Sequence, residues 1–124
     1  MGTVFKIVVT GNHDTSDVNY VNELFEALEP IGPFLTSKER SSRTILFSGI
    51  YLNGFIQDIH NENGENLLLW VSKNWGVKIK VRSITTSESD EEYLIYNKGV
   101  VEKEDSYVIY DDEADKAIRA FEKF

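Results

Sequence analysis

The two histidines are the first residues to examine for chemistry, because an imidazole can act as an acid, a base or a metal ligand near neutral pH. His13 precedes Asp14 and could form an acid–base pair with it, whereas His60 has no metal-type residue at ligand spacing. A loop histidine beside a helix-capping aspartate is the simpler interpretation of the first pair. We therefore expect no catalytic residue at either histidine.

The sequence also lacks the residues that other common catalytic mechanisms require. The chain contains no cysteine, which excludes a disulfide framework, a zinc ribbon and a thiol nucleophile. No serine stands in a glycine-flanked elbow, and Gly11 lacks the further glycines and the Lys-Ser pair of a phosphate-binding loop. The acidic run at residues 111–115 could hold a divalent cation, but a helix start also favours acids. We expect a non-enzymatic protein without cofactor or metal; a small metal-dependent enzyme centred on this run is an alternative.

Residues 77–84 alternate between apolar and polar side chains, a pattern typical of a strand with one buried face and one solvent-exposed face. The basic row formed by Lys78, Lys80 and Arg82 lies near aromatic residues and resembles a nucleic-acid platform on a sheet. Ion pairs with acidic residues on neighbouring strands explain the same row. We expect sheet pairing, and a nucleic-acid-binding module that uses this row is the alternative.

Acidic residues are distributed unevenly along the chain. The whole sequence has 21 acidic and 13 basic residues, a net charge of −8, and residues 88–115 alone carry eleven acids against two lysines. This balance argues against sequence-independent binding of nucleic acid, which requires clustered cations. Tyrosines stand among the acids, and tyrosine beside carboxylate suits the recognition of a basic protein surface. A solvated face that serves only solubility is the alternative.

The predicted partner-binding residues are therefore the acids and tyrosines of this segment. We expect them to contact a basic protein, and to bind neither nucleic acid nor a membrane directly. They are Glu88, Asp90, Glu91, Glu92, Tyr93, Tyr96, Glu102, Glu104, Asp105, Tyr107, Tyr110, Asp111 and Asp112.

The elements that must position these residues follow from hydrophobic periodicity. A run rich in β-branched and aromatic residues predicts a strand over residues 3–10, and apolar residues three to four apart predict a helix over residues 18–29. A second helix is predicted over residues 67–75, ended by the following glycine. Trp70 and Trp75 lie on it with apolar neighbours on several sides, so we expect both in the core.

The segment between these helices is strand-like. Residues 44–50 predict a clear strand, and a short strand at residues 34–36 precedes a polar turn at residues 37–42. Asn53-Gly54 then predicts a hairpin, because both residues tolerate a positive φ. Alternatively, Phe55 and the apolar residues after it form the first turns of the next helix. Both interpretations leave two strands in this region.

The C-terminal third predicts an antiparallel extension. Two strands are expected at residues 93–96 and 107–110, with a turn at residues 97–99 and with Val100 and Val101 paired as well. A final helix with an apolar stripe is expected to begin near Asp111.

The order of these elements predicts an α+β fold with a ferredoxin-like βαββαβ core, an antiparallel β extension and a C-terminal helix. A chain of 124 residues that is 41% apolar fits one domain over residues 1–124. No stretch approaches the roughly 18 consecutive apolar residues that span a bilayer, and the first residues lack the pattern of a signal peptide. We therefore expect a cytoplasmic protein.

Two short motifs carry a resemblance to a known family. Asn74-Trp75-Gly76 ends the second predicted helix before a strand, and Pro30-Ile31-Gly32-Pro33 follows the first helix. In these features, and above all over Trp70 to Lys78, the chain resembles small ferredoxin-like proteins of unknown function carried by bacteriophages and conjugative plasmids. The resemblance implies a mobile-element origin and supplies no catalytic residues.

Charge and resemblance lead to one functional expectation. We expect a phage or mobile-element protein that binds a basic partner, such as a nucleic-acid-binding host protein. Inhibition of a host-defence nuclease through mimicry of nucleic-acid charge is the form that we expect this binding to take.

Overall fold

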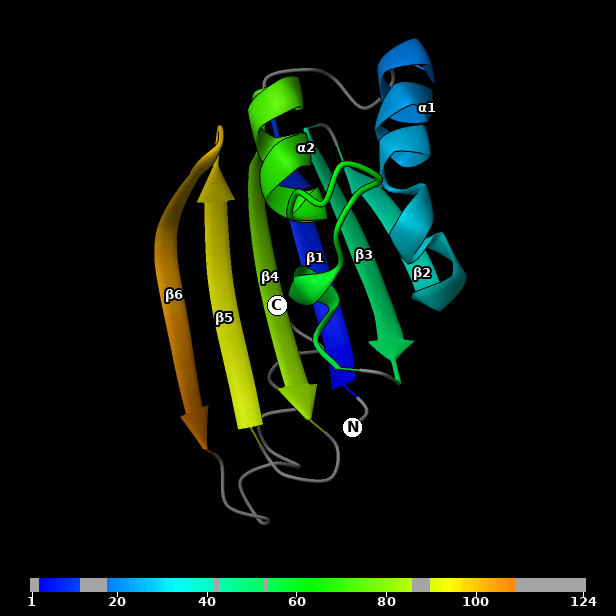
Figure 1. Cartoon of the computed structure of the whole chain (residues 1–124). Coiled ribbons are helices and arrows are strands. Elements are labelled where there is room, and N and C mark those ends of the chain that lie inside the picture. Colours follow the sequence, from blue (N-terminus) through cyan, green and yellow to red (C-terminus); the bar gives the residue numbers. More distant parts are fainter. Residues whose placement is uncertain (1–2, 12–17, 42, 53, 86–89, 109–124) are drawn as a thin grey trace.

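The computed structural model describes residues 3–11, 18–41, 43–52, 54–85 and 90–108 (Figure 1). The predicted α+β class is confirmed, because a six-stranded antiparallel sheet carries two α-helices on one face. Among the described residues, no helix is long and apolar enough to cross a lipid bilayer.

The sheet is built around its first strand. The strands lie in the order β2-β3-β1-β4-β5-β6, and every neighbouring pair is antiparallel. The first strand pairs along its whole length with β3 and β4, so that Ile7 lies opposite Phe47 on one side and Val81 on the other. The strand bounds are β1 Thr3–Thr10, β2 Leu35–Ser41, β3 Thr44–Tyr51, β4 Lys78–Thr85, β5 Asp90–Asn97 and β6 Val100–Val108.

The core lies between this sheet and the helices α1 (Val18–Ala27) and α2 (Leu67–Trp75). Alternate residues of β1 supply its centre, since a strand directs every second side chain to one face. Each large apolar side chain that is fully buried contributes about 1.5–3 kcal/mol to stability. The buried apolar residues on β1 and the two helices are Phe5, Ile7, Val9, Val21, Leu24, Leu67, Leu68 and Val71.

Both ends of α2 are capped, the C-terminal end by the glycine that the sequence predicts. The Asn66 side chain accepts a hydrogen bond from the Leu69 backbone N–H at 3.2 Å, which satisfies one of the unpaired donors of the first turn. Gly76 ends the helix with φ 61°, a left-handed conformation that favours glycine.

The prediction that Trp70 and Trp75 belong to the core was too strong. Both side chains are only partly buried, and they pack against the core and against each other with ring centroids 5.5 Å apart and an interplanar angle of 67°. The fully buried stripe of α2 consists of Leu67, Leu68, Val71 and Ser72. Trp70 flanks this stripe, and Trp75 is the last residue of the helix.

The predicted polar turn at residues 37–42 is mostly strand. The edge strand β2 extends to Ser41 and pairs with β3, although every residue of β2 after Leu35 is exposed. An edge strand is stabilised by backbone hydrogen bonds along one side, so it can form without the alternating pattern by which a strand is recognised. Residue 42 lies outside the described residues.

The predicted hairpin at Asn53-Gly54 was wrong. After β3 the chain enters a short 3-10 helix, η2 (Ile56–Asp58), and no described strand follows until β4. The Gly54 carbonyl accepts a hydrogen bond of 2.6 Å from the Thr3 hydroxyl, so this segment is held against the start of β1 instead of reversing along β3. The alternative also fails, because the next α-helix begins only at Leu67.

The antiparallel extension is present as β5 and β6. The turn between them contains Lys98 with φ 51° and Gly99 with φ 88°, as the turn chemistry predicts. One strand, β6, replaces the two separate strand segments expected at Val100 and at residues 107–110. The predicted C-terminal helix lies outside the described residues.

The central position of β1 generates a stability prediction. Replacing Ile7, which is 0% exposed, by alanine should lower the free energy of unfolding by about 2–5 kcal/mol, because it leaves a cavity between both neighbouring strands and the helices. Ile50→Ala is a matched control at a residue 48% exposed on β3, and should cost less than about 1 kcal/mol. Urea denaturation followed by circular dichroism measures both, and equal costs would contradict this account of the core.

Candidate functional site

The acidic segment predicted to bind a partner forms the outer two strands of the sheet. Its described members on β5 are Asp90, Glu91, Glu92, Tyr93 and Tyr96, and those on β6 are Glu102, Glu104, Asp105 and Tyr107. The backbone register places Glu91 opposite Tyr107 and Tyr93 opposite Asp105, so acids and tyrosines of the two strands are brought together. Glu88, Tyr110, Asp111 and Asp112 lie outside the described residues.

The two tyrosines of β5 face opposite sides of the sheet. Tyr96 is 5% exposed and belongs to the hydrophobic core, so it offers no surface to a partner and its proposed binding role is corrected. Tyr93 is partly buried on the other face, with the Arg82 guanidinium 4.9 Å from its ring centroid. Alternation along a strand allows only one of two residues three positions apart to face outward.

Glu92 is engaged inside the molecule. Its carboxylate accepts a hydrogen bond from the side-chain amide of Gln57, a residue of η2 that is 2% exposed. The Ser83 hydroxyl on β4 donates to the other end of the same amide at 2.9 Å. A buried amide needs such partners because leaving it unsatisfied costs about 1–3 kcal/mol. Glu92 therefore helps hold η2 on the sheet. The residues around Glu92 in the sequence do not predict this role.

Glu102 also has internal partners. One carboxylate oxygen lies 3.9 Å from the Lys78 ammonium, and the other accepts a hydrogen bond of 2.6 Å from the Asn97 side chain. Both Lys78 and Glu102 are 42% exposed, so their attraction is weakened by water.

The basic row lies on the face of β4 that points away from the helices. The predicted alternation is confirmed, since Ile79 and Val81 are buried while the three cations are partly exposed. Lys78 pairs with Glu102 and Arg82 lies over Tyr93, which agrees with the expectation that the row serves sheet pairing. Lys80 has an interaction partner too.

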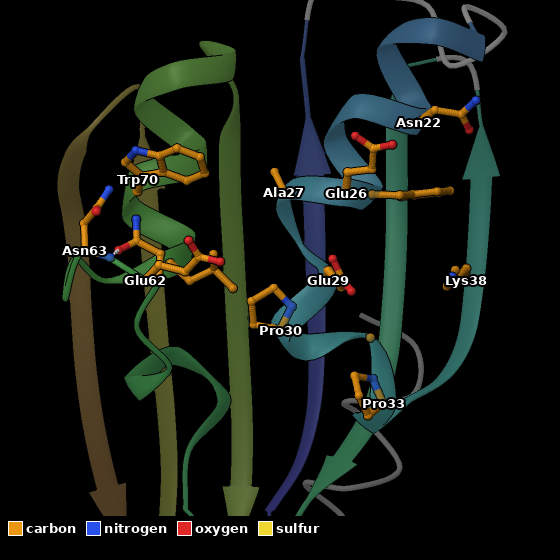
Figure 2. Close-up of a pocket in the computed structure, with 14 residues that line it drawn as sticks. Asn22, Glu26, Ala27, Glu29, Pro30, Pro33, Lys38, Glu62, Asn63 and Trp70 are labelled. Atoms are coloured by element: carbon orange, nitrogen blue, oxygen red, sulfur yellow. Dashed lines mark hydrogen bonds between the residues drawn. The ribbon is translucent and has the colours of Figure 1, made fainter.

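A cleft between the two helices is a concave feature of the described residues that the sequence did not predict (Figure 2). It has a volume of about 1110 Å³ and lies between α1 with the following 3-10 helix η1 (Glu29–Phe34) on one side and the start of α2 with the preceding loop on the other. Its lining is Asn22, Phe25, Glu26, Ala27, Glu29, Pro30, Gly32, Pro33, Lys38, Asn61, Glu62, Asn63, Leu67 and Trp70.

Local structure holds both walls of the cleft. The Asn61 side chain accepts hydrogen bonds from the backbone N–H groups of Asn63 at 3.0 Å and Glu65 at 2.9 Å, which fixes the turn that presents Glu62. On the opposite wall, Pro30 and Pro33 each restrict a backbone φ within η1. Figure 2 shows Trp70 and Glu62 on one side, with Pro30 and Glu26 facing them across the gap.

The cleft is acidic and partly aromatic. Its lining contains the carboxylates of Glu26, Glu29 and Glu62 and a single cation, Lys38. Within the described part of the chain, no ion pair or side-chain hydrogen bond engages these three carboxylates. The Lys38 ammonium lies 5.1 Å from the centroid of the Phe25 ring, a cation–π contact.

Sequence reasoning missed this site because its residues come from four separate segments. In the sequence, each of the three glutamates has the pattern of an ordinary exposed residue. The two prolines indicate only the end of a helix. Partly exposed Trp70 is the one residue whose type could have drawn attention, since tryptophan is enriched at binding surfaces.

A metal centre has no support in the described residues, where no group of three or more His, Asp or Glu side chains could hold an ion. The acidic run at residues 111–115, on which the enzyme alternative rests, lies outside them.

The internal pairing of the basic row generates a prediction. Replacing Lys78, Lys80 and Arg82 together with glutamine should lower the free energy of unfolding by about 1 kcal/mol, the scale of exposed cross-strand pairs, and leave partner binding within a few-fold. Thermal unfolding of the purified triple variant measures this change. A variant as stable as the wild type would show that the row does not support the sheet.

Comparisons of the chain with models of protein families, with curated proteins and with solved structures found no match.

Proposed function

We propose that this protein is a non-enzymatic binding protein that engages a basic protein partner. The observation that carries the proposal is the unbalanced negative charge: the chain has a net charge of −8, and the cations of β4 already have interaction partners within the protein. The carboxylates of the cleft have none among the described residues. Excess negative charge attracts a cationic partner over several ångströms and raises its rate of association.

Mimicry of nucleic-acid charge is the form of this function that we favour. A protein that binds nucleic acid carries a cationic surface, and an acidic protein can occupy that surface in place of phosphates. The mobile-element origin implied by the resemblance at Trp70 to Lys78 would make a host-defence nuclease a natural target class. Under this proposal the protein acts as an inhibitor in the cytoplasm and needs no cofactor.

We also propose that the first four strands and both helices form a ferredoxin-like core. The chain order β1-α1-β2-β3-α2-β4 and the sheet order β2-β3-β1-β4 support this assignment. The pair β5 and β6 then extends the core beyond β4. This fold hosts many unrelated functions, so it adds nothing to the case for a basic partner.

Binding to simple charged probes tests the proposed function. We expect the protein to bind a fluorescent arginine-rich peptide and to ignore single-stranded DNA of similar length. The association rate should fall at least about tenfold between roughly 50 and 300 mM salt, because added ions screen the attraction between exposed charges. Stopped-flow fluorescence measures the rate, and anisotropy measures binding to the DNA.

Two results would count against this function. An association rate indifferent to salt would leave the acidic charge with a role in solubility alone. Retention of the DNA, lost when the basic row is replaced by glutamine, would favour the nucleic-acid-binding alternative.

A further inference from the structure

We infer that the cleft between α1 and α2 receives the basic partner, and that its occupant is an extended segment of that partner carrying arginine or lysine. This inference rests on the proposed function and gives it a location. It differs from the expectation drawn from the sequence, which placed the contact on the acidic extension.

The charges of the cleft favour a cationic occupant. Glu26 and Glu29 lie on the α1 side and Glu62 lies on the α2 side, so a cation between the walls has carboxylates on both sides (Figure 2). All three side chains are exposed. A cationic side chain placed there adds favourable contacts without first breaking an ion pair within the described structure.

The acids of the extension contrast with those of the cleft. Glu92 is held by Gln57, and Glu102 is shared between Lys78 and Asn97. A partner that recruited either carboxylate would have to replace contacts that support the sheet. The cleft therefore offers charge at a lower cost than Glu92 and Glu102 do.

Aromatic rings give the cleft a second means of binding cations. Among the lining residues, Lys38 of β2 already lies over the Phe25 ring, so this ring has a cation of the protein itself as its partner. Trp70 is partly exposed on the opposite wall, and tryptophan is the aromatic residue that attracts cations most strongly. A guanidinium can stack on such a ring while its N–H groups reach a neighbouring carboxylate.

The size and stiffness of the cleft favour a peptide segment. Pockets for small molecules usually measure about 300–1,000 Å³, and at about 1110 Å³ this cleft lies at the upper end of that range, with room for several side chains. The Asn61 turn and the two prolines already hold the walls, so binding would order little of this protein's backbone. An extended segment with several side chains can fill such a groove.

Paired charge variants test the location. Replacing Glu26, Glu29 and Glu62 together with glutamine should weaken binding of a hexa-arginine peptide about tenfold, the scale of three exposed ion pairs. The control variant replaces Glu23, Glu39 and Glu65 with glutamine. These three residues are exposed and lie outside the cleft lining, so the control changes the net charge by the same amount as the cleft variant. It should alter the affinity less than about twofold. Isothermal titration calorimetry at low salt measures both, after circular dichroism shows that each variant is folded.

Tryptophan fluorescence provides an independent measurement. In a Trp75→Phe protein, Trp70 is the sole tryptophan, and the hexa-arginine peptide should change its emission with the same midpoint as the calorimetric titration. In a Trp70→Phe protein, emission from Trp75, which lies outside the cleft lining, should change little. Trp70→Leu should speed dissociation of the peptide about tenfold, because buried aromatic contacts determine how long a complex lasts.

The possible failures are distinguishable. If the wild-type protein does not bind the peptide, the proposed function and this inference both fall. If it binds but both triple variants weaken binding equally, the partner is basic and the cleft is not its site. Equal binding of a hexa-serine peptide would mean that charge is not recognised there, and would also overturn the inference.

Discussion

The double pairing of β1 is the constraint on which the rest of the structure depends. This strand is hydrogen-bonded to β3 on one side and to β4 on the other, and its alternate residues lie beneath both helices. Strands on either side are thereby joined into one sheet, with the β2-β3 pair at one flank and the β4-β5-β6 meander at the other. Because β3, β4 and both helices share one hydrophobic core with the buried side chains of β1, a defect in β1 reaches both helices.

The same arrangement creates the cleft. Each helix packs on the sheet through its own apolar stripe, and the space between them is bordered by Asn22 and Glu26 of α1 and by Leu67 and Trp70 of α2. The helices approach one another, and η1 and the Asn61 turn complete the border of the cleft. Exposed glutamates and partly buried aromatic rings meet there as a consequence of core packing, without a local sequence motif.

Buried polar contacts decide which acids remain available. The segment after β3 crosses the sheet below α2 and buries the Gln57 amide, which must find partners in Ser83 and Glu92. Glu92 thus serves the fold although it belongs to the most acidic part of the sequence. Total charge is a property of composition, whereas the charge that a partner can meet depends on these internal contacts.

The sequence by itself determined the elements whose signals are local. Strand β1 follows from its β-branched and aromatic run, α1 and α2 from apolar spacing with Asn66 and Gly76 as caps, and β4 from its alternation. Only the tertiary structure decided that β2 would continue along an edge, that Gly54 would bend toward Thr3, and that Tyr96 would be buried. It also decided that Glu26, Glu62 and Trp70 would share a cleft. Periodicity and capping act between residues a few positions apart, while edge pairing, burial and helix juxtaposition depend on partners distant in the chain, which no short sequence window contains.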